Sequence, residues 1–186
     1  MTAATTTTAR PIEGTYAADP IHSSFGFGVK HMGVSTFRGT LSDVDATLSA
    51  EDGELSLVGT ARPESISIVK PEQFRAHVLG AEFFDIENHP EIGFRSTSVE
   101  LAEDGTARVE GELTIKGISK PIVATGTYTE PREGPQGLVA AVELEAKFDR
   151  REFEFNWQME VPNGGIALDY DVTLQIHLEL GQSVEA

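Results

Sequence analysis

Apolar side chains recur at every second position along two long stretches of this chain. In residues 138–148 every even-numbered position is apolar, whereas Glu143, Glu145 and Lys147 all fall at odd-numbered positions. Residues 172–180 repeat the pattern, with aliphatic residues alternating with polar or charged ones. Successive side chains of a β-strand point to opposite faces, so this alternation predicts long strands with one apolar and one polar face.

Shorter alternating segments bring the expected number of strands to about eight, and turn signals such as Glu51-Asp52-Gly53 favour antiparallel neighbours. Long strands with one apolar face leave unpaired edges unless the sheet closes on itself. We therefore expect an all-β protein with an eight-stranded antiparallel barrel, wide enough either to be filled by side chains or to hold one elongated ligand. Its first wall strand is expected to run from Gly14 to about His31.

One segment breaks the β pattern. Pro71 suits the first turn of a helix, and Phe74, His77 and Val78 follow at the spacing of one helical face. A helix over residues 71–79 is too short to be stable alone, so its apolar face must pack onto other apolar surface. We expect this single short helix to lie near the mouth of the barrel.

Glycine occupies several positions that the alternation assigns to the lumen. Gly39, Gly59 and Gly111 are in phase with apolar neighbours, and Gly126 is a further candidate. Large side chains at these positions would fill the interior of the barrel. Because glycine has no side chain, these positions predict that the lumen is filled by something other than the protein's own side chains.

The segment from Asp19 to Gly39 combines aromatic residues, glycines and a histidine in a strand-like pattern. Phe25, Phe27 and Val29 occupy alternate positions, and His31 continues the same face. The intervening glycines are typical of a curved strand or of a close approach by another group. This face is expected to line the lumen, with His31 as a polar contact at one end.

Composition limits the class of protein. Thirty acidic residues against fourteen basic ones give a formal charge of -16, which disfavours nucleic acid as a partner. Cysteine is absent, which excludes disulfides and thiolate chemistry. Residues 1–13 are expected to form a disordered tail rich in Thr and Ala, followed by a single barrel domain over residues 14–182.

The beginning of the chain lacks the basic segment and apolar run of a secretory signal. No stretch approaches the roughly 20 apolar residues of a membrane span. We therefore expect a cytoplasmic protein without a stable membrane anchor.

Three groups of residues carry a resemblance to a known protein family. They are Asp19-Pro20-Ile21-His22-Ser23 with Phe27, His31 and Gly33; Phe83-Phe84-Asp85 with Pro90, Ile92, Phe94 and Ser96; and Gly111-Glu112-Leu113-Thr114-Ile115-Lys116-Gly117-Ile118-Ser119 with Pro121. These groups resemble motifs of the polyisoprenoid-binding YceI-like proteins, and the similarity extends over roughly residues 14–180. The resemblance implies a lipocalin-like, eight-stranded antiparallel barrel with a hydrophobic tunnel for a long isoprenoid or similar amphiphile.

Two segments depart from the family pattern. Where the family often has Arg-Asp-x-His-Leu, this chain has Phe74-Arg75-Ala76-His77-Val78, which keeps the histidine but not the Arg-Asp pair. Where the family often has Asn-Arg-x-Asp-Phe-Gly, this chain has Asp149-Arg150-Arg151-Glu152-Phe153-Glu154. The second difference places Glu154 where the family has glycine. It therefore affects the expected conformation of the local turn and any ligand contact at that position.

The pattern and the resemblance together predict a non-catalytic binding or carrier protein that needs no cofactor or metal. Its expected partner is a long apolar amphiphile, a polyisoprenoid or an isoprenoid quinone, because an apolar tunnel is sufficient to bind such a tail. His31, His77 and Arg75 are candidates for contact with its head group. The residues predicted to bind the ligand are Phe25, Phe27, Val29, His31, Phe74, Arg75, His77, Phe83, Phe84, Phe94 and Trp157.

Other classes of function stay open from the sequence alone. Histidines 22, 31, 77 and 89, with Asp85 nearby, allow a metal-dependent or acid–base enzyme. His22 and His31 differ in strand parity, however, so a regular strand places them on opposite faces. An interaction protein with a solid barrel is also compatible with the composition, and the sequence does not decide whether two barrels form a homodimer.

Overall fold

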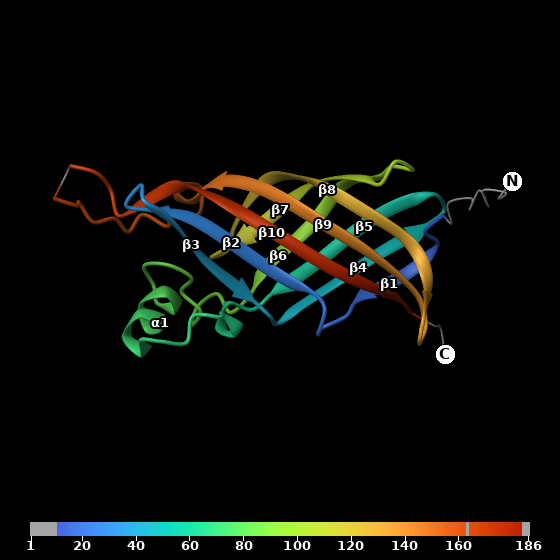
Figure 1. The fold of residues 1–186 in the computed structure, drawn as a ribbon, viewed down its shortest axis with the longest axis horizontal. Helices are drawn as coiled ribbons and strands as arrows, with labels where there is room; N and C mark the ends of the chain where they lie inside the picture. The colour runs from blue at the N-terminus through green and yellow to red at the C-terminus, as the bar shows by residue number, and fades with distance from the viewer. Residues whose placement is uncertain (1–10, 163, 184–186) are drawn as a thin grey trace, which may run out of the picture.

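The computed structural model describes residues 11–162 and 164–183, and it is built mainly from β-strands. The strands form one antiparallel sheet that closes into an elongated barrel (Figure 1). The predicted disordered tail lies mostly outside the described residues, since only residues 11–13 of it are described. The elements are β1 (Gly14–Ala18), β2 (Ser24–His31), β3 (Ser35–Leu41), β4 (Val44–Glu51), β5 (Glu54–Ala61), η1 (Pro63–Ser65), α1 (Glu72–Leu79), β6 (Ile92–Leu101), β7 (Thr106–Ile115), β8 (Ile118–Gly134), β9 (Gly137–Asp149), η2 (Arg150–Phe153) and β10 (Leu168–Gln182).

The barrel closes at one end because β1 pairs with both β4 and β10. At the other end β2 takes the place of β1 beside β10, and β3 pairs with β2. Thus β1 and β2 are two halves of one wall strand, and β3 and β4 are two halves of the next. The ten strands of the sheet therefore make an eight-stranded antiparallel barrel, which confirms the predicted fold. We call the β1 end the closed end and the α1 end the mouth.

The first wall strand is interrupted rather than continuous to His31, so that part of the prediction was wrong. The side-chain Oδ1 of Asp19 accepts hydrogen bonds from the backbone N–H groups of Ile21 (2.7 Å) and His22 (3.0 Å), which turns the chain. These hydrogen bonds also lower the pKa of the Asp19 carboxyl group. The turn allows β1 and β2 to pair with different partners.

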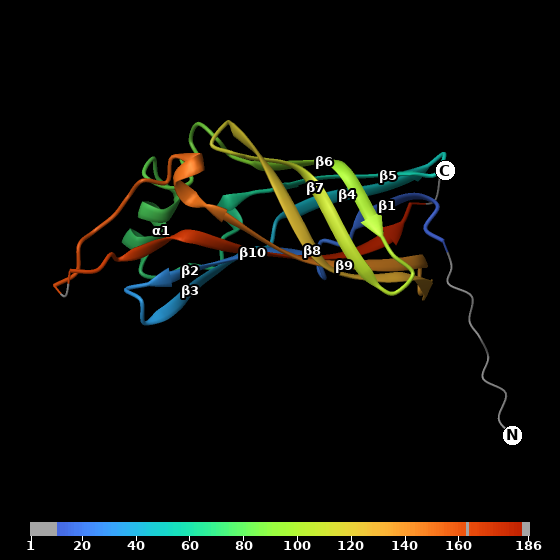
Figure 2. The ribbon, with the colours of Figure 1, turned by 90° about the horizontal axis from the view of Figure 1, so that it is seen from above.

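Residues 62–91 complete the barrel wall at the mouth. In the described part of the chain β3 pairs with β2 along one edge and with no strand along its other edge. On one side of this segment, Ile66 forms an isolated bridge with Leu41 of β3. On the other side, Lys116 Nζ donates a hydrogen bond to the carbonyl of Ala81 (3.2 Å). Helix α1 belongs to this segment and lies at the mouth, as predicted (Figures 1 and 2).

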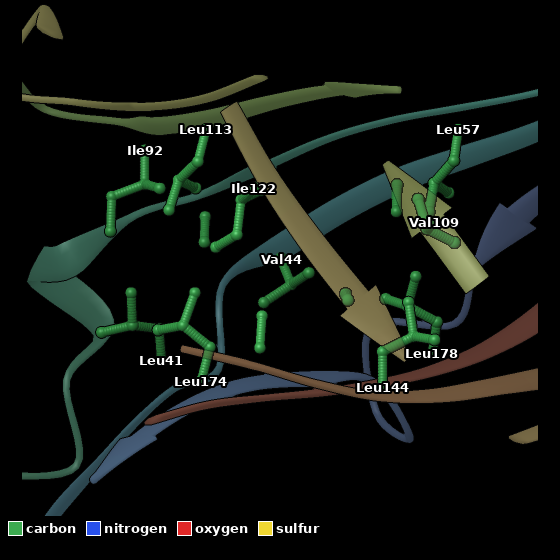
Figure 3. Close-up of a cluster of buried hydrophobic side chains, with 14 of the residues drawn as sticks. Leu41, Val44, Leu57, Ile92, Val109, Leu113, Ile122, Leu144, Leu174 and Leu178 are labelled. Carbon is green, nitrogen blue, oxygen red and sulfur yellow. The ribbon is translucent and has the colours of Figure 1, made fainter. Parts of the chain in front are cut away.

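The interior of the barrel is packed solid at the closed end. Tyr16, Leu48, Val142 and Leu180 are among the largest fully buried side chains of the described residues. Further along, aliphatic side chains from opposite walls point toward one another across the interior (Figure 3). The core therefore follows the apolar faces that the alternation predicts.

The glycines predicted to leave space in the lumen instead accommodate neighbouring groups. A Cβ atom at Gly39 would lie 2.5 Å from the ring of Phe27, its direct partner across β2 and β3. A Cβ atom at Gly111 would lie 2.6 Å from the ring of Phe94. At Gly59 and Gly126 the main chain of an adjacent strand comes close. The interpretation as ligand space was wrong for Gly39, Gly111 and Gly126, because phenylalanine rings or backbone occupy that space, whereas Gly59 lines an apolar cavity of the barrel.

We expect Gly111→Ala to lower the free energy of unfolding by about 1–3 kcal/mol, the usual cost of overpacking. The added methyl group would meet the Phe94 ring and also the carbonyl oxygen of Arg95, which cannot move without the strand. The change is measured by urea denaturation. Gly181→Ala in β10 is the matched control, since nothing lies within 4 Å of its added Cβ. Equal stability of the two variants would contradict this explanation.

Candidate functional site

An apolar cavity of two adjoining chambers extends from the mouth into the middle of the barrel. The outer chamber, beside α1, has a volume of about 390 Å³, and the inner chamber has about 80 Å³. Phe25, Ile92 and Leu174 line both chambers. Along β10 the lining extends from Leu168 to Leu178, a distance of about 33 Å at about 3.3 Å per residue. The cavity is therefore long, and its smaller chamber is the one toward the closed end.

The inner chamber is lined mainly by aliphatic side chains. Leu57, Leu113 and Leu144 reach it from different walls, and Figure 3 shows them pointing inward. Ala124 of β8 and Ala146 of β9 are direct partners in the sheet, and both line this chamber. Because these two neighbouring side chains are small, they leave the space of the inner chamber unfilled where β8 and β9 pair.

The structure brings most of the predicted ligand-binding residues together. Phe94 lines the inner chamber. Arg75 lines neither chamber, and its Nη2 donates a hydrogen bond to the carbonyl of Glu64 (2.6 Å). The predicted residues that line the outer chamber are Phe25, Phe27, Val29, His31, Phe74, His77, Phe83, Phe84 and Trp157.

Aromatic contacts join the α1 segment to the loop after η2 at the mouth. The ring of Trp157 lies 5.5 Å from the ring of His77 and 5.7 Å from that of Phe83, measured between centroids. Phe155 lies 5.6 Å from Phe84 in an edge-to-face arrangement. Such pairs prefer tilted or edge-to-face geometry and stabilise the contact beyond simple burial. Two segments that are far apart in the sequence thus close one side of the outer chamber together.

Arg150 is a buried charged side chain that lines the outer chamber, and only 3% of it is exposed. Its Nε donates to the carbonyl of Asp169 (2.8 Å), its Nη2 to the carbonyl of Leu168 (3.2 Å), and its Nη1 to the carbonyl of Phe155. The guanidinium carbon lies 5.1 Å from the centre of the Tyr170 ring. Burial lowers the pKa of Arg150, because the charged form is less well solvated there.

The neighbouring arginine has a different environment. Arg151 is exposed, its Nε donates to Asp149 Oδ1 (2.9 Å), and its guanidinium group lies 4.0 Å from the Tyr170 ring centre. The hydrogen bonds from Arg151 lower the pKa of the Asp149 carboxyl group. Asp149 thus pairs with the exposed arginine and not with the buried one.

The histidines of the first half of the chain do not form one metal-binding group. His31 and His77 line the outer chamber. His22 lies with Asp19 and Glu179 on the surface, its Nδ1 being 3.2 Å from Asp19 Oδ1 and 3.4 Å from Glu179 Oε1. Within the described residues, this surface group is the one cluster of three potential metal ligands. The structure therefore separates the histidines on which the enzyme alternative depended.

A model of the YceI-like domain family matches residues 16–180. The chain belongs to the YceI-like family. The single α-helix of the described residues has 8 residues and is too short and polar to cross a membrane.

One relative and two solved structures illustrate what this chain is similar to. A UPF0312 protein of Pseudomonas savastanoi is 31% identical over 118 residues, which cover 62% of this chain and 62% of the relative, so the match spans less than two thirds of that protein. The YceI protein of Campylobacter jejuni superposes with a TM-score of 0.69 at 23% identity, covering 83% of this chain and 90% of that one. A polyisoprenoid binding domain from Saccharophagus degradans superposes with a TM-score of 0.61 at 10% identity, covering 92% and 100%. At these identities the two structural likenesses establish the fold.

The glutamate that replaces the family glycine keeps a glycine-like backbone. Glu154 has a φ of 59° and a ψ of 26°, the left-handed conformation that favours glycine. Its N–H donates to the carbonyl of Arg151 (3.1 Å), and the next N–H, that of Phe155, donates to the carbonyl of Arg150 (3.1 Å). In this YceI-like chain the turn after η2 is therefore made with a non-glycine residue in the left-handed conformation.

Sequence reasoning missed several residues of the outer chamber. Phe37 pairs with Val29 across β2 and β3, and its phase with Gly39 and Leu41 was a usable signal. Phe148 ends the long alternation of β9 and also faces the chamber. Arg150 was visible only as part of a motif, because a residue in a short turn has no periodicity to follow.

Proposed function

We propose that this YceI-like protein is a non-catalytic binding or carrier protein for a long apolar amphiphile, a polyisoprenoid or an isoprenoid quinone. The observation that carries the proposal is the long apolar cavity, whose smaller chamber is the one toward the closed end. The outer chamber is within the range of about 300–1,000 Å³ that is usual for small-molecule sites. The barrel is hollow where a solid interaction module would be filled.

Burial of the tail supplies enough free energy for binding. Each methylene group transferred from water is worth about 0.8 kcal/mol, so ten buried carbons contribute about 8 kcal/mol before the costs of association. The narrow inner chamber suits an unbranched or methyl-branched tail, whereas the wider outer chamber suits a bulkier end. No catalytic side chain is needed for this role.

The ligand-binding residues are proposed to be the aromatic and aliphatic side chains of the cavity. Phe25, Phe27 and Val29 line the outer chamber from β2, and the rings of Phe84 and Trp157 line it from the α1 segment and the loop after η2. The Saccharophagus degradans domain, described as polyisoprenoid binding, shares this barrel fold and supports an isoprenoid as the ligand class.

Native mass spectrometry of the protein purified from its own host tests the proposal. We expect a bound species whose mass, after organic extraction, matches a prenyl lipid or an isoprenoid quinone. Adding an isoprenoid to delipidated protein should raise Tm, since a ligand at 100 times its Kd stabilises the folded state by about 2.7 kcal/mol. Lipid-free protein whose Tm does not respond to isoprenoids of several tail lengths would refute the carrier function.

A further inference from the structure

The geometry points to Arg150 as the residue that receives the polar head of the ligand, through acceptor oxygens that the head offers. This inference rests on the proposed function and adds to it the orientation of the ligand and the chemistry of its head. The head lies in the outer chamber, and the tail extends along β10 into the inner chamber.

Arg150 retains unused hydrogen-bonding capacity. A guanidinium group carries five N–H donors, and main-chain carbonyls of Phe155, Leu168 and Asp169 account for three of them. One N–H on each terminal nitrogen is left without a hydrogen bond within the described residues. These two donors and the positive charge are available to a group that enters the chamber.

No carboxylate forms a salt bridge with Arg150 within the described residues, although the charges of Asp149 and Asp169 favour its charged form from a greater distance. Asp149, its neighbour in sequence, is engaged by Arg151. The side chain of Asp169 accepts from the N–H of Tyr170 (2.7 Å), and only its carbonyl contacts Arg150. A buried charge is normally paired, because the loss of hydration is otherwise uncompensated. An oxygen-bearing ligand head would supply the direct contact with a negative or acceptor oxygen that neither carboxylate makes.

The surroundings of Arg150 favour a ligand over bulk water as that partner. Among the residues that line the outer chamber, Arg150 is the permanently charged one, and His31 and His77 are the titratable ones. Phe148, Leu168 and Val172 lie beside it in the lining. A single cation in an apolar chamber binds acceptor oxygens more strongly than it would in water, because the local dielectric constant is low.

The chemical class of the head follows from the donors. Two N–H groups on neighbouring nitrogens match carbonyl or phosphate oxygens, since guanidinium groups hydrogen-bond such acceptors in a fork. A quinone ring and a prenyl phosphate both offer this chemistry, whereas a pure hydrocarbon offers none. The chamber should therefore select amphiphiles with acceptor-bearing heads.

The test uses four ligands that share one prenyl tail and differ in the head: the hydrocarbon, the alcohol, the quinone and the monophosphate. We expect delipidated wild-type protein to bind the quinone or the monophosphate about 10- to 100-fold more tightly than the hydrocarbon, the range of a hydrogen bond to a charged group. Comparing the affinities for the quinone and the monophosphate shows whether Arg150 prefers a carbonyl head or an oxyanion head.

Arg150→Met removes the donors and keeps an unbranched apolar side chain. We expect this variant to bind the hydrocarbon as wild type does and to lose the preference for the quinone or monophosphate. Arg151→Met is the matched control, because Arg151 is exposed and bonds to Asp149 outside the chamber. It should keep the full preference.

The outcomes separate the two proposals. If the wild-type protein binds all four ligands with equal affinity, the role of Arg150 is refuted while the carrier function stands. If it binds none of them, the carrier function itself fails. Because the wild-type comparison needs no variant, the inference can be refuted even if Arg150→Met does not fold. A folded Arg150→Met protein that keeps the preference would also refute it.

Discussion

A Phe27→Asp variant is expected to lose the ligand that the wild-type barrel retains, with affinity lowered on the order of 1,000-fold. The Phe27 ring lies over Gly39 and contacts the rings of Phe37 and Phe84, each at 6.1 Å between centroids, in the wall of the outer chamber. Losing this apolar surface costs about 1.5–3 kcal/mol. A carboxyl group in an apolar chamber adds a desolvation cost, so the sum reaches the 4.1 kcal/mol that corresponds to about 1,000-fold.

The variant is compared with Val123→Asp, which places the same carboxyl group on the outside of β8, where Val123 is 44% exposed. Ligand retention is measured by native mass spectrometry and Kd by fluorescence titration with an isoprenoid. Circular dichroism establishes that both variants are folded. If folded Phe27→Asp protein retains ligand at the wild-type level, Phe27 lies outside the binding site.

An Ala146→Phe variant is expected to shorten the tail that the barrel can accept. Ala146 lines the inner chamber and pairs with Ala124 across β9 and β8. A phenylalanine ring there would occupy much of the 80 Å³ chamber. If four tail carbons are displaced, binding weakens by about 3 kcal/mol at about 0.8 kcal/mol per methylene, or roughly 100-fold.

This loss should depend on tail length. A long prenyl ligand should bind roughly 100-fold more weakly to Ala146→Phe, whereas a short one that ends in the outer chamber should bind as before. Ala141→Phe is the control, because the odd-numbered residues of β9 face away from the lumen. Equal weakening of long and short ligands would indicate general damage to the barrel, and no weakening of either would show that the tail does not enter the inner chamber.

The alternation of apolar residues was sufficient to predict the walls of the barrel and the faces that point inward. In β10, Val172, Leu174 and Leu178 are buried or line the cavity as the pattern requires. In β2, the face that begins at Phe25 and ends at His31 lines the outer chamber. These positions are predictable because a strand has a fixed period and a closed sheet has only one interior.

Positions outside regular strands were not predictable in the same way. Arg75 and Arg150 are both charged residues near aromatic motifs, yet only Arg150 lies in the cavity lining. Trp157 reaches the mouth from an irregular loop, where its place depends on contacts with α1. The break at Asp19 likewise depends on which strand lies opposite each half of the wall. Such features arise from tertiary contacts that a local pattern does not contain.

The two ends of the barrel differ in how many main-chain hydrogen bonds hold the wall. At the closed end β1 forms antiparallel backbone pairs with both β4 and β10. At the mouth, residues 62–91 are attached to β3 by one isolated bridge and a few hydrogen bonds. Local opening costs less free energy where fewer backbone pairs must break. We therefore expect residues 62–91 to open more readily than β1 and β10, so that their amide protons exchange with solvent first. A molecule as long as the cavity can pass through such an opening while the ladder at the closed end keeps the barrel folded.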